Sequence, residues 1–376
     1  MPAFHDKPFD DSTLAKLSIF RGYIREWLSV FMTDRLYQRN YKAELQIFDF
    51  FAGPGYDSEN NAGSPVIITE EIKNYCLQRQ EYKADVNIKL FFNDAEPLNI
   101  DKLKKRIVGI SCKKGCCNVI FSANDFSIAL NEYLPLIRKQ NIANLIIMDQ
   151  FGVKEVTPEI VRLFSECRKT DILFFISSSI IKRFCELPEI KNRFQIKPDE
   201  VKDIEYKTIH RYICEYYREN VKGIEYYLAP FSIQKGANIY GIIFGSSSLR
   251  GLEKFLKICW DNDKKTGEAN YNIDNDCCYN GQLSIFENEN QFKKINQFQN
   301  EIIEYVKKEN PDNKMMYKYV LTKGFSVTKS NEVLNELQKK GLISTYEIKS
   351  GKSARKASFY IEYKYYTQEP KIKFKV

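Results

Sequence analysis

The chain contains 376 residues, of which 43% are hydrophobic and 28% are charged, and its formal net charge is +8 at pH 7. This length allows two domains, and this balance of apolar and charged residues excludes a largely disordered chain. No apolar stretch of the sequence approaches the roughly 18 residues that a membrane-spanning helix requires, so we expect a soluble, cytoplasmic protein without a membrane partner.

The positive charge is concentrated in the C-terminal region. Residues 291–376 contain 18 Lys and Arg against 9 Asp and Glu, whereas the residues before them contain 39 against 40. A basic region beside a neutral one is typical of proteins that bind a polyanion. We therefore expect nucleic acid, either DNA or RNA, as a partner of the C-terminal region.

The N-terminal part of the chain predicts a helix, a buried strand and a second helix. Apolar residues recur at steps of three and four over 12–32, the pattern of an amphipathic helix that packs on a sheet. Lys16 or Arg21 of this helix is a candidate for the mouth of a binding site. The mostly apolar run 45–51 predicts a buried strand, and Ser64 predicts the N-cap of a helix that starts at Pro65 and ends near position 79.

A glycine turn, Asp-Phe-Phe-Ala-Gly-Pro-Gly, ends the first strand at Asp49–Gly55. Glycines in such a turn let the backbone approach a nucleotide-like ligand. A dinucleotide site would require a third glycine, but position 58 is Ser, and an acid about 20 residues further on. The shorter turn favours S-adenosylmethionine, held by Asp49, Ala52, Gly53 and Gly55. The alternative is a tight turn that binds no ligand.

Two further strands, 88–93 and 118–121, are each followed by an acidic residue. Asp94 could accept hydrogen bonds from both hydroxyls of a ribose. Asp125 could bind the amino group of an adenine, cap the helix that starts at 126, or do both. The alternative for Asp94 is a purely structural acid at the start of a helix.

The fourth strand, 144–148, ends in a second candidate site. Because ligands bind where the strand order of a doubly wound sheet reverses, between strands one and four, we expect Asp49 and Asp149 to be neighbours. Methyltransferases that act on exocyclic amines of bases often have an acid or Asn, a Pro and an aromatic residue here. Asp149 would hold the acceptor amine and Phe151 would stack on an extruded base, although Gln150 stands where Pro is usual. The alternative is that Asp149 caps the next helix.

The remaining elements of the first domain predict its fold class. A fifth strand at 172–176 is followed by a helical segment at 180–222, which could form a lid and in which His210 is expected to be structural. Two strands joined by a short turn at 234–237 then form a hairpin. The fold is predicted to be α/β, a doubly wound, Rossmann-like, seven-stranded methyltransferase sheet over residues 1–260.

The C-terminal region predicts a second, smaller domain. Residues 261–291 are polar and aperiodic, as in a linker. Residues 292–376 contain three predicted helices and strands at 342–348 and 358–363, which is the pattern of a winged helix. Five basic residues are the candidates for nucleic-acid contact, one in the third helix and four in the wing: Lys329, Lys349, Lys352, Arg355 and Lys356. The alternative is a winged helix that contacts protein.

Ten cysteines are present, but their spacing does not match the paired knuckles of a structural zinc site. We expect free thiols and no metal site. A metal at Cys112, Cys116 and Cys117 is a minor hypothesis.

Four segments together resemble the three-Cys-motif partner proteins: Asp49–Gly55, Gly63–Pro65, Asp149–Gly152 and 239–260. The resemblance covers roughly residues 12–260 and implies a fold like that of class I S-adenosylmethionine-dependent methyltransferases. It also implies a phage-related partner protein that carries three cysteines. The expected function is methyl transfer to nucleic acid, in phage defence or mobile-element biology. The alternative, which Gln150 favours, is a non-catalytic adaptor that binds nucleic acid for a partner enzyme.

Overall fold

The computed structural model of the protein describes residues 7–32, 42–78, 85–110, 117–150, 152–194, 196–281 and 292–376. The chain divides into two compact units, Met1–Ser248 and Leu249–Val376. Within the described ranges, no helix is both long enough and apolar enough to cross a membrane.

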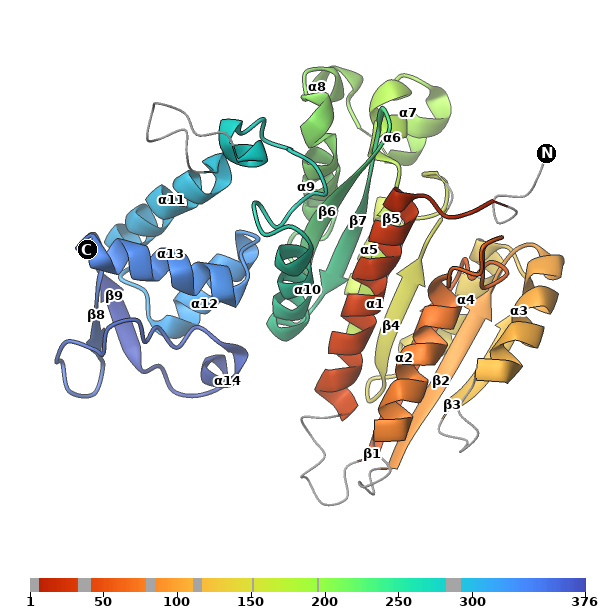
Figure 1. The fold of residues 1–376 in the computed structure, drawn as a ribbon, viewed down its shortest axis with the longest axis horizontal. Coiled ribbons are helices and arrows are strands. Elements are labelled where there is room, and N and C mark those ends of the chain that lie inside the picture. The colour runs from red at the N-terminus through yellow and green to blue at the C-terminus, as the bar shows by residue number, and fades with distance from the viewer. Residues whose placement is uncertain are drawn as a thin grey trace. The chain divides into compact units, whose positions relative to one another are not determined.

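The first unit is built on a seven-stranded sheet in the order β3-β2-β1-β4-β5-β7-β6 (Figure 1). The strands β1 to β5 run parallel to one another, whereas β7 is antiparallel to both β5 and β6. The strand bounds are β1 Lys42–Asp49, β2 Asp85–Asn93, β3 Cys117–Ser122, β4 Ala143–Met148, β5 Thr170–Ile176, β6 Tyr227–Lys235 and β7 Asn238–Ser246. This arrangement confirms the predicted doubly wound sheet with a closing hairpin, and it fits a Rossmann-like methyltransferase fold.

The sheet is buried because helices pack on it. All six residues of β4 are buried, as expected of a central parallel strand. The helices α1 Asp11–Met32 and α2 Ser64–Gln78 lie side by side in front of the sheet in Figure 1. Ion pairs join them, because Arg21 contacts Glu70 at 2.8 Å and Glu71 at 2.9 Å. Arg21 thus holds two helices together and does not line the candidate site. The other helices that follow β2 to β4 are α3 Pro97–Ile110, α4 Phe126–Ile137 and α5 Pro158–Ser165.

The segment between β5 and β6 contains several short helices and one longer helix. They are α6 Ser178–Arg183, α7 Pro188–Phe194, α8 Pro198–Lys202 and α9 Ile209–Asn220. His210 in α9 is fully buried, with Nδ1 2.8 Å from the Ser178 hydroxyl and Nε2 3.1 Å from the Ile242 carbonyl oxygen. Since a carbonyl oxygen can only accept, Nε2 carries the proton and Nδ1 accepts from Ser178. This arrangement agrees with the structural role predicted for His210.

The second unit begins with α10 Leu249–Asn262, which the sequence analysis placed mostly in the first domain. The helix packs within the second unit, where the Tyr317 hydroxyl donates to Glu253 Oε2 at 2.6 Å. Ala269 and Ile273, in the segment expected to be a linker, are fully buried. The later elements are α11 Lys293–Glu309, α12 Asn313–Thr322, α13 Val327–Lys339, β8 Ser344–Glu347, α14 Tyr363–Tyr366 and β9 Ile372–Lys375.

The strand predicted at 358–363 is wrong, because the partner of β8 is β9 at 372–375. Residues 355–371 instead form an excursion that includes α14. Ala357 and Tyr360 have φ values of +57° and +53°, which no strand accommodates.

Of the described cysteines, seven are free thiols, as predicted. Cys76 is disulfide-bonded, contrary to the expectation, because spacing along a sequence does not reveal which thiols a fold brings together. No group of potential metal ligands occurs among the described residues, and Cys112 and Cys116 lie outside them.

The contact between His210 and β7 gives a stability prediction. A Cβ atom added at Gly241 would overlap the buried imidazole ring of His210, so Gly241→Ala should lower the free energy of unfolding by about 1–3 kcal/mol. The matched control is Gly109→Ala in α3, where the new Cβ meets no atom within 4 Å. There the higher helix propensity of Ala should raise the free energy of unfolding by up to about 1 kcal/mol. Urea denaturation checks both variants, and equal stabilities of the two would contradict the tight contact.

Candidate functional site

The candidate site lies at the carboxyl ends of β1 and β4, where the strand order reverses. Asp49 is the last residue of β1 and pairs in register with Ile147 of β4. A cavity of about 40 Å³ lies between the glycine turn, Asp149 and the N-terminal residues Phe9, Thr13, Lys16 and Leu17. The structure therefore brings the two halves of the predicted site together.

The glycine turn has the predicted conformation. Gly53 and Gly55 have φ values of +62° and +93°, in the left-handed region that favours glycine. A Cβ atom at Gly55 would come within 2.8 Å of Leu103 Cδ1. The turn then folds back, because the Gly63 N–H donates to the Gly55 carbonyl oxygen at 2.8 Å. Ala52 is buried beside it, with its N–H donating to the Asn93 carbonyl oxygen at 2.8 Å.

The helix α2 begins one residue earlier than predicted. The Gly63 carbonyl oxygen accepts from the Ile67 N–H at 3.0 Å, so Gly63 occupies the N-cap position that the sequence analysis gave to Ser64. The buried Ser64 side chain instead interacts with Asp49.

Asp94 anchors the glycine turn. Its Oδ2 accepts from the Gly53 N–H at 2.9 Å, and its Oδ1 accepts from the Glu96 N–H at 2.9 Å and from Asn99 Nδ2 at 3.0 Å. The side chain predicted to bind a ribose therefore also fixes the conformation of the turn. Asp125 is exposed and is the N-cap residue of α4, as predicted, with its carbonyl oxygen accepting from the Ala129 N–H at 3.0 Å. Its side chain makes no capping hydrogen bond.

Asn93 is a central residue of the site that the sequence analysis missed. Its side chain is buried, and Nδ2 donates to the carbonyl oxygens of Phe50 at 3.2 Å and Asn124 at 2.9 Å. Its Oδ1 accepts from the Ser122 hydroxyl at 2.8 Å and from the Asn124 N–H at 3.2 Å. One amide thus joins the ends of β1, β2 and β3. The signal that could have revealed it is a polar residue at the end of an otherwise apolar strand.

Lys16 and Asp149 form an ion pair across the cavity. Lys16 Nζ lies 2.7 Å and 2.6 Å from the two carboxylate oxygens, and the side chains are only 8% and 17% exposed. Lys16 Nζ also lies 4.6 Å from the centroid of the Phe175 ring. Of the two cations proposed for the mouth of the site, Lys16 lines it. Phe151, the proposed stacking residue, lies outside the described residues.

Gln150 supports the loop that follows β4. The side chain is buried, and its Oε1 accepts from the backbone N–H groups of Glu155 at 2.8 Å and Val156 at 3.2 Å. A proline could not accept these bonds, so the departure from the usual Pro has a structural reason in this chain. Its Nε2 is buried without a hydrogen-bond partner among the described residues.

Asp49 is an unusual carboxyl group because it is buried at 1% exposure. Its Oδ1 accepts from the Phe51 N–H at 3.2 Å, while its Oδ2 is buried with no hydrogen-bond partner in the part of the chain described. Burial raises the pKa of Asp49 to about 7, and the negative charges of Asp149 and Asp94 also raise it, while Ser64 and the Phe51 N–H oppose the shift.

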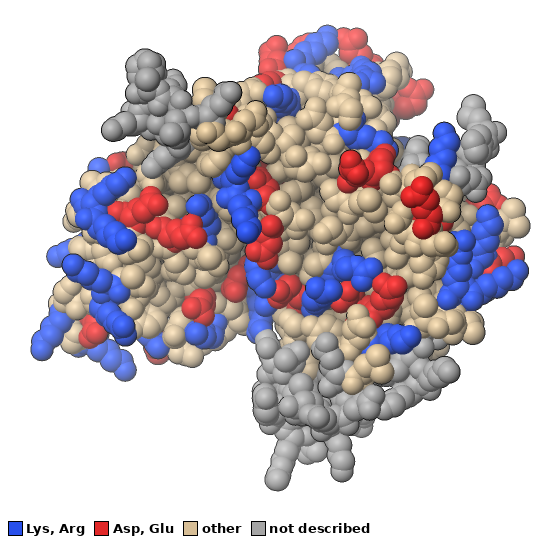
Figure 2. Space-filling view, in the orientation of Figure 1, with Lys and Arg blue, Asp and Glu red and all other residues tan. Residues whose placement is uncertain are grey.

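The five candidate nucleic-acid residues all lie in the second unit. Lys349, Lys352, Arg355 and Lys356 are exposed in the segment after β8, and Lys329 in the first turn of α13 pairs with Glu332 at 2.9 Å. Figure 2 shows that Lys and Arg side chains predominate along the left edge of the view, over this unit.

No family model matches the chain, and no curated protein matches it. Among solved structures, it is similar to Trm1 from Pyrococcus horikoshii in complex with S-adenosyl-L-methionine, with 12% identity, a TM-score of 0.39, and 71% of this chain and 64% of that chain covered. It is also similar to magnesium protoporphyrin IX methyltransferase from Synechocystis PCC 6803 with bound SAH, with 8% identity, a TM-score of 0.33, and coverages of 64% and 89%. This chain thus spans about two thirds of the length of Trm1.

The buried carboxyl group of Asp49 predicts a pH-dependent stability. Because its folded pKa of about 7 exceeds the value of about 3.9 in an unfolded chain, the free energy of unfolding should fall as pH rises from about 4 through 7, by an amount on the order of 4 kcal/mol. Asp49→Asn cannot ionise, so its melting temperature should rise relative to the unchanged protein between pH 5 and pH 8. The exposed Asp101→Asn is the control, and a pH-independent difference for Asp49→Asn would contradict the raised pKa.

Proposed function

We propose that this protein is an S-adenosylmethionine-dependent methyltransferase that acts on nucleic acid. One observation carries the cofactor assignment: a turn with two left-handed glycines, anchored by Asp94, lies beside the buried Asp49 at the point where the strand order reverses.

The charges of the site favour a cationic cofactor. Asp94 and Asp149 are close enough to Asp49 for their negative charges to raise its pKa. Of these three acids, only Asp149 is paired with Lys16. The sulfonium and ammonium groups of S-adenosylmethionine suit such a site, whereas the pyrophosphate of a dinucleotide would be repelled. Asp49 Oδ2, which has no partner within the described ranges, is an acceptor that a bound donor could satisfy.

Each residue of the site has a proposed role. Asp94 would accept from the ribose hydroxyls, Asp125 from an adenine amino group, and the glycine turn would admit the cofactor next to the backbone. The cofactor supplies an electrophilic methyl group. Asp149 would accept from the amine of the substrate once Lys16 releases it, and Phe151 would stack on the substrate base.

Binding of the whole cofactor requires a rearrangement near α1. The cavity of about 40 Å³ is far smaller than the roughly 300 Å³ at which small-molecule sites begin. Phe9 and Thr13 line it, and the Phe9 N–H donates to Asp57 Oδ2 at 2.6 Å. We therefore expect the residues at the start of α1 to move when the cofactor binds.

The alternative function is a non-catalytic adaptor with the same fold. It is favoured by the ion pair in which Lys16 contacts both oxygens of Asp149, since this carboxylate is then unavailable to an acceptor amine. A tritiated-methyl assay on DNA and RNA separates the two functions. Methyl transfer by the unchanged protein that is lost in Asp149→Ala supports the enzyme. Cofactor binding without methyl transfer supports the adaptor.

The second unit is proposed to be a winged helix that supplies affinity for nucleic acid. Its three helices α11, α12 and α13 are followed by the antiparallel pair of β8 and β9, and a bridge between Asp312 and Lys373 adds a third short segment to this pair. The exposed cations after β8 favour contact with phosphates. The resemblance to three-Cys-motif partner proteins extends the proposal to a phage-related partner that carries three cysteines, in phage defence or mobile-element biology.

The cofactor assignment predicts binding of S-adenosylmethionine in isothermal titration calorimetry. Asp94→Ala should weaken binding by roughly tenfold or more, since it removes both the ribose acceptor and the anchor of Gly53. The control is Asp101→Ala, an exposed acid of α3 whose loss should leave the affinity unchanged. Absence of binding at millimolar cofactor would contradict the assignment.

The assignment of the second unit predicts a change in salt dependence. Replacing Lys352 and Arg355 by Ala should weaken binding to duplex DNA and reduce the slope of log K against log salt by about 2, since each phosphate contact contributes about 0.9. The control replaces Lys339 and Lys340 by Ala, which removes the same amount of charge at the end of α13. An unchanged slope for the first pair would instead indicate a surface that binds protein.

A further inference from the structure

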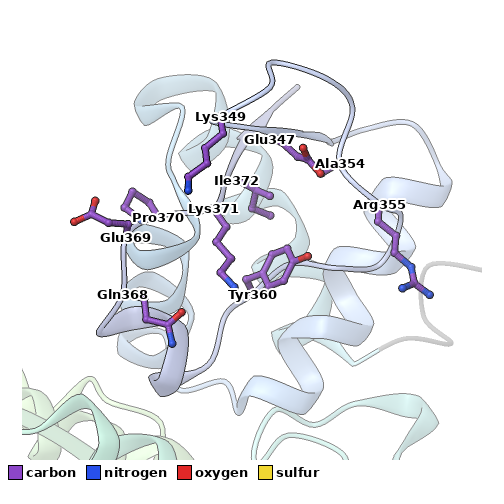
Figure 3. A pocket seen from close by; sticks show the side chains of 10 residues that line it. All are labelled: Glu347, Lys349, Ala354, Arg355, Tyr360, Gln368, Glu369, Pro370, Lys371 and Ile372. Atoms are coloured by element: carbon purple, nitrogen blue, oxygen red, sulfur yellow. The ribbon is translucent and has the colours of Figure 1, made fainter.

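The second unit contains a pocket of about 380 Å³, which lies next to two of the candidate nucleic-acid residues. It lies between the segment after β8 and the segment that leads into β9 (Figure 3). Its lining includes Lys349, Arg355, Tyr360, Gln368 and Lys371. The volume falls in the range of roughly 300–1,000 Å³ typical of small-molecule sites.

The lining of the pocket contains three cations and two acids, Glu347 and Glu369. Lys349, Arg355 and Lys371 form no ion pair with the described residues, and of the two acids in the lining Glu347 accepts from the Ser350 hydroxyl at 2.7 Å. Figure 3 shows the Lys371 side chain beside the ring of Tyr360, and Lys349 on the same side of the pocket as Lys371. The Arg355 side chain points away from both. Lys349 and Lys371 are therefore available to bind an anionic group.

Tyr360 is held in place at a conformational cost. Its φ of +53° is unfavourable for a residue with a large side chain, and such strain is common at ligand sites. The Tyr365 ring packs against it at a centroid distance of 5.1 Å and an angle of 86°. Lys371 Nζ lies 5.1 Å from the centroid of Tyr360 and 4.4 Å from that of Tyr365.

One buried amide positions both Tyr360 and Lys371. Asn313, at the start of α12, is fully buried, and its Nδ2 donates to the Tyr360 carbonyl oxygen at 3.1 Å. Its Oδ1 accepts from the Lys371 N–H at 2.8 Å and from the Ile372 N–H at 3.4 Å. The aromatic ring and the cation are thus pre-organised by the core of the unit, as expected of a binding site.

We propose that this pocket binds one nucleotide of a single-stranded nucleic acid. The base would stack on Tyr360, and the phosphate would contact Lys349 and Lys371. The side-chain amide of Gln368, which also lines the pocket, would form a hydrogen bond with the edge of the base. An acidic peptide would use the cations but not the aromatic ring, so the combination favours a nucleotide. The inference rests on the proposed function of the second unit in nucleic-acid binding.

Fluorescence anisotropy with two labelled strands of twelve nucleotides tests the proposal. One strand is oligo-deoxythymidine, and the other has the same phosphates but no bases. The full-length protein should bind the first strand about tenfold more tightly, the effect of stacking one base. Tyr360→Leu should remove this preference, and Lys371→Gln should weaken binding of both strands. Tyr305→Leu, a half-buried tyrosine of α11 outside the pocket, should preserve the preference, and thermal melts verify that each variant is folded.

The possible outcomes separate this inference from the proposed function. Equal binding of the two strands by the unchanged protein, or a preference that survives Tyr360→Leu, would overturn the nucleotide pocket and leave nucleic-acid binding intact. No binding of either strand or of duplex DNA would overturn the proposed function itself. Displacement of the deoxythymidine strand by an oligo-aspartate peptide at equal concentration would assign the pocket to acidic peptides and overturn the proposal.

Discussion

The candidate site depends on the ion pair of Lys16 and Asp149. It joins the N-terminal helix to the end of β4, over 133 positions of sequence, and it is nearly excluded from water. Two charges in such a place are tolerated only because each neutralises the other, and removal of one partner would leave an uncompensated buried charge. The pair therefore fixes α1 over the glycine turn, and it determines that the cavity is bounded by Phe9, Thr13 and Leu17.

The site has an excess of acidic groups, because Lys16 pairs with only one of its three aspartates. Lys16 neutralises Asp149, but Asp94 uses its oxygens on backbone and amide donors, and Asp49 has a raised pKa in the buried space between them. A protein without a cationic ligand here would have little reason to bury an acid whose second oxygen has no partner among the described residues. The electrostatics of the site and the conformation of its turn thus lead to the same cofactor class by separate arguments.

The positions of Asp49, Asp94 and Asp149 could be predicted because each follows a strongly apolar run, and the order of parallel strands brings such ends together. Asn93 has only a weak sequence signal, a polar residue at the end of an apolar strand, and that signal does not show the four hydrogen bonds that its surroundings offer. The sequence shows only that Gln150 stands where a proline is usual. Its structural role could not be predicted, because its hydrogen bonds with Glu155 and Val156 depend on how the next loop folds back.

The error in the second unit has a similar cause. Residues 358–363 and 372–375 are both short segments that contain Ile and aromatic residues, which favour strands, and the first is the richer of the two in aromatic residues. Asn313 contributes to the choice between them, because its amide holds the chain at Tyr360 within the excursion and at Lys371 and Ile372, where β9 begins. Predictions from local pattern therefore succeed for the sheet of the first unit, where burial is continuous, and fail where one side-chain contact decides the path.

The Asn313 amide donates one hydrogen bond and accepts two, and all three are made with backbone groups that cannot exchange roles. An aspartate would lack the donor and a leucine would lack both, although each has nearly the same size. Selection can therefore vary the ring and the cation of the pocket independently, whereas this position in the core admits almost no substitute. Sequences that share the pocket should be recognisable by an asparagine that never touches the ligand.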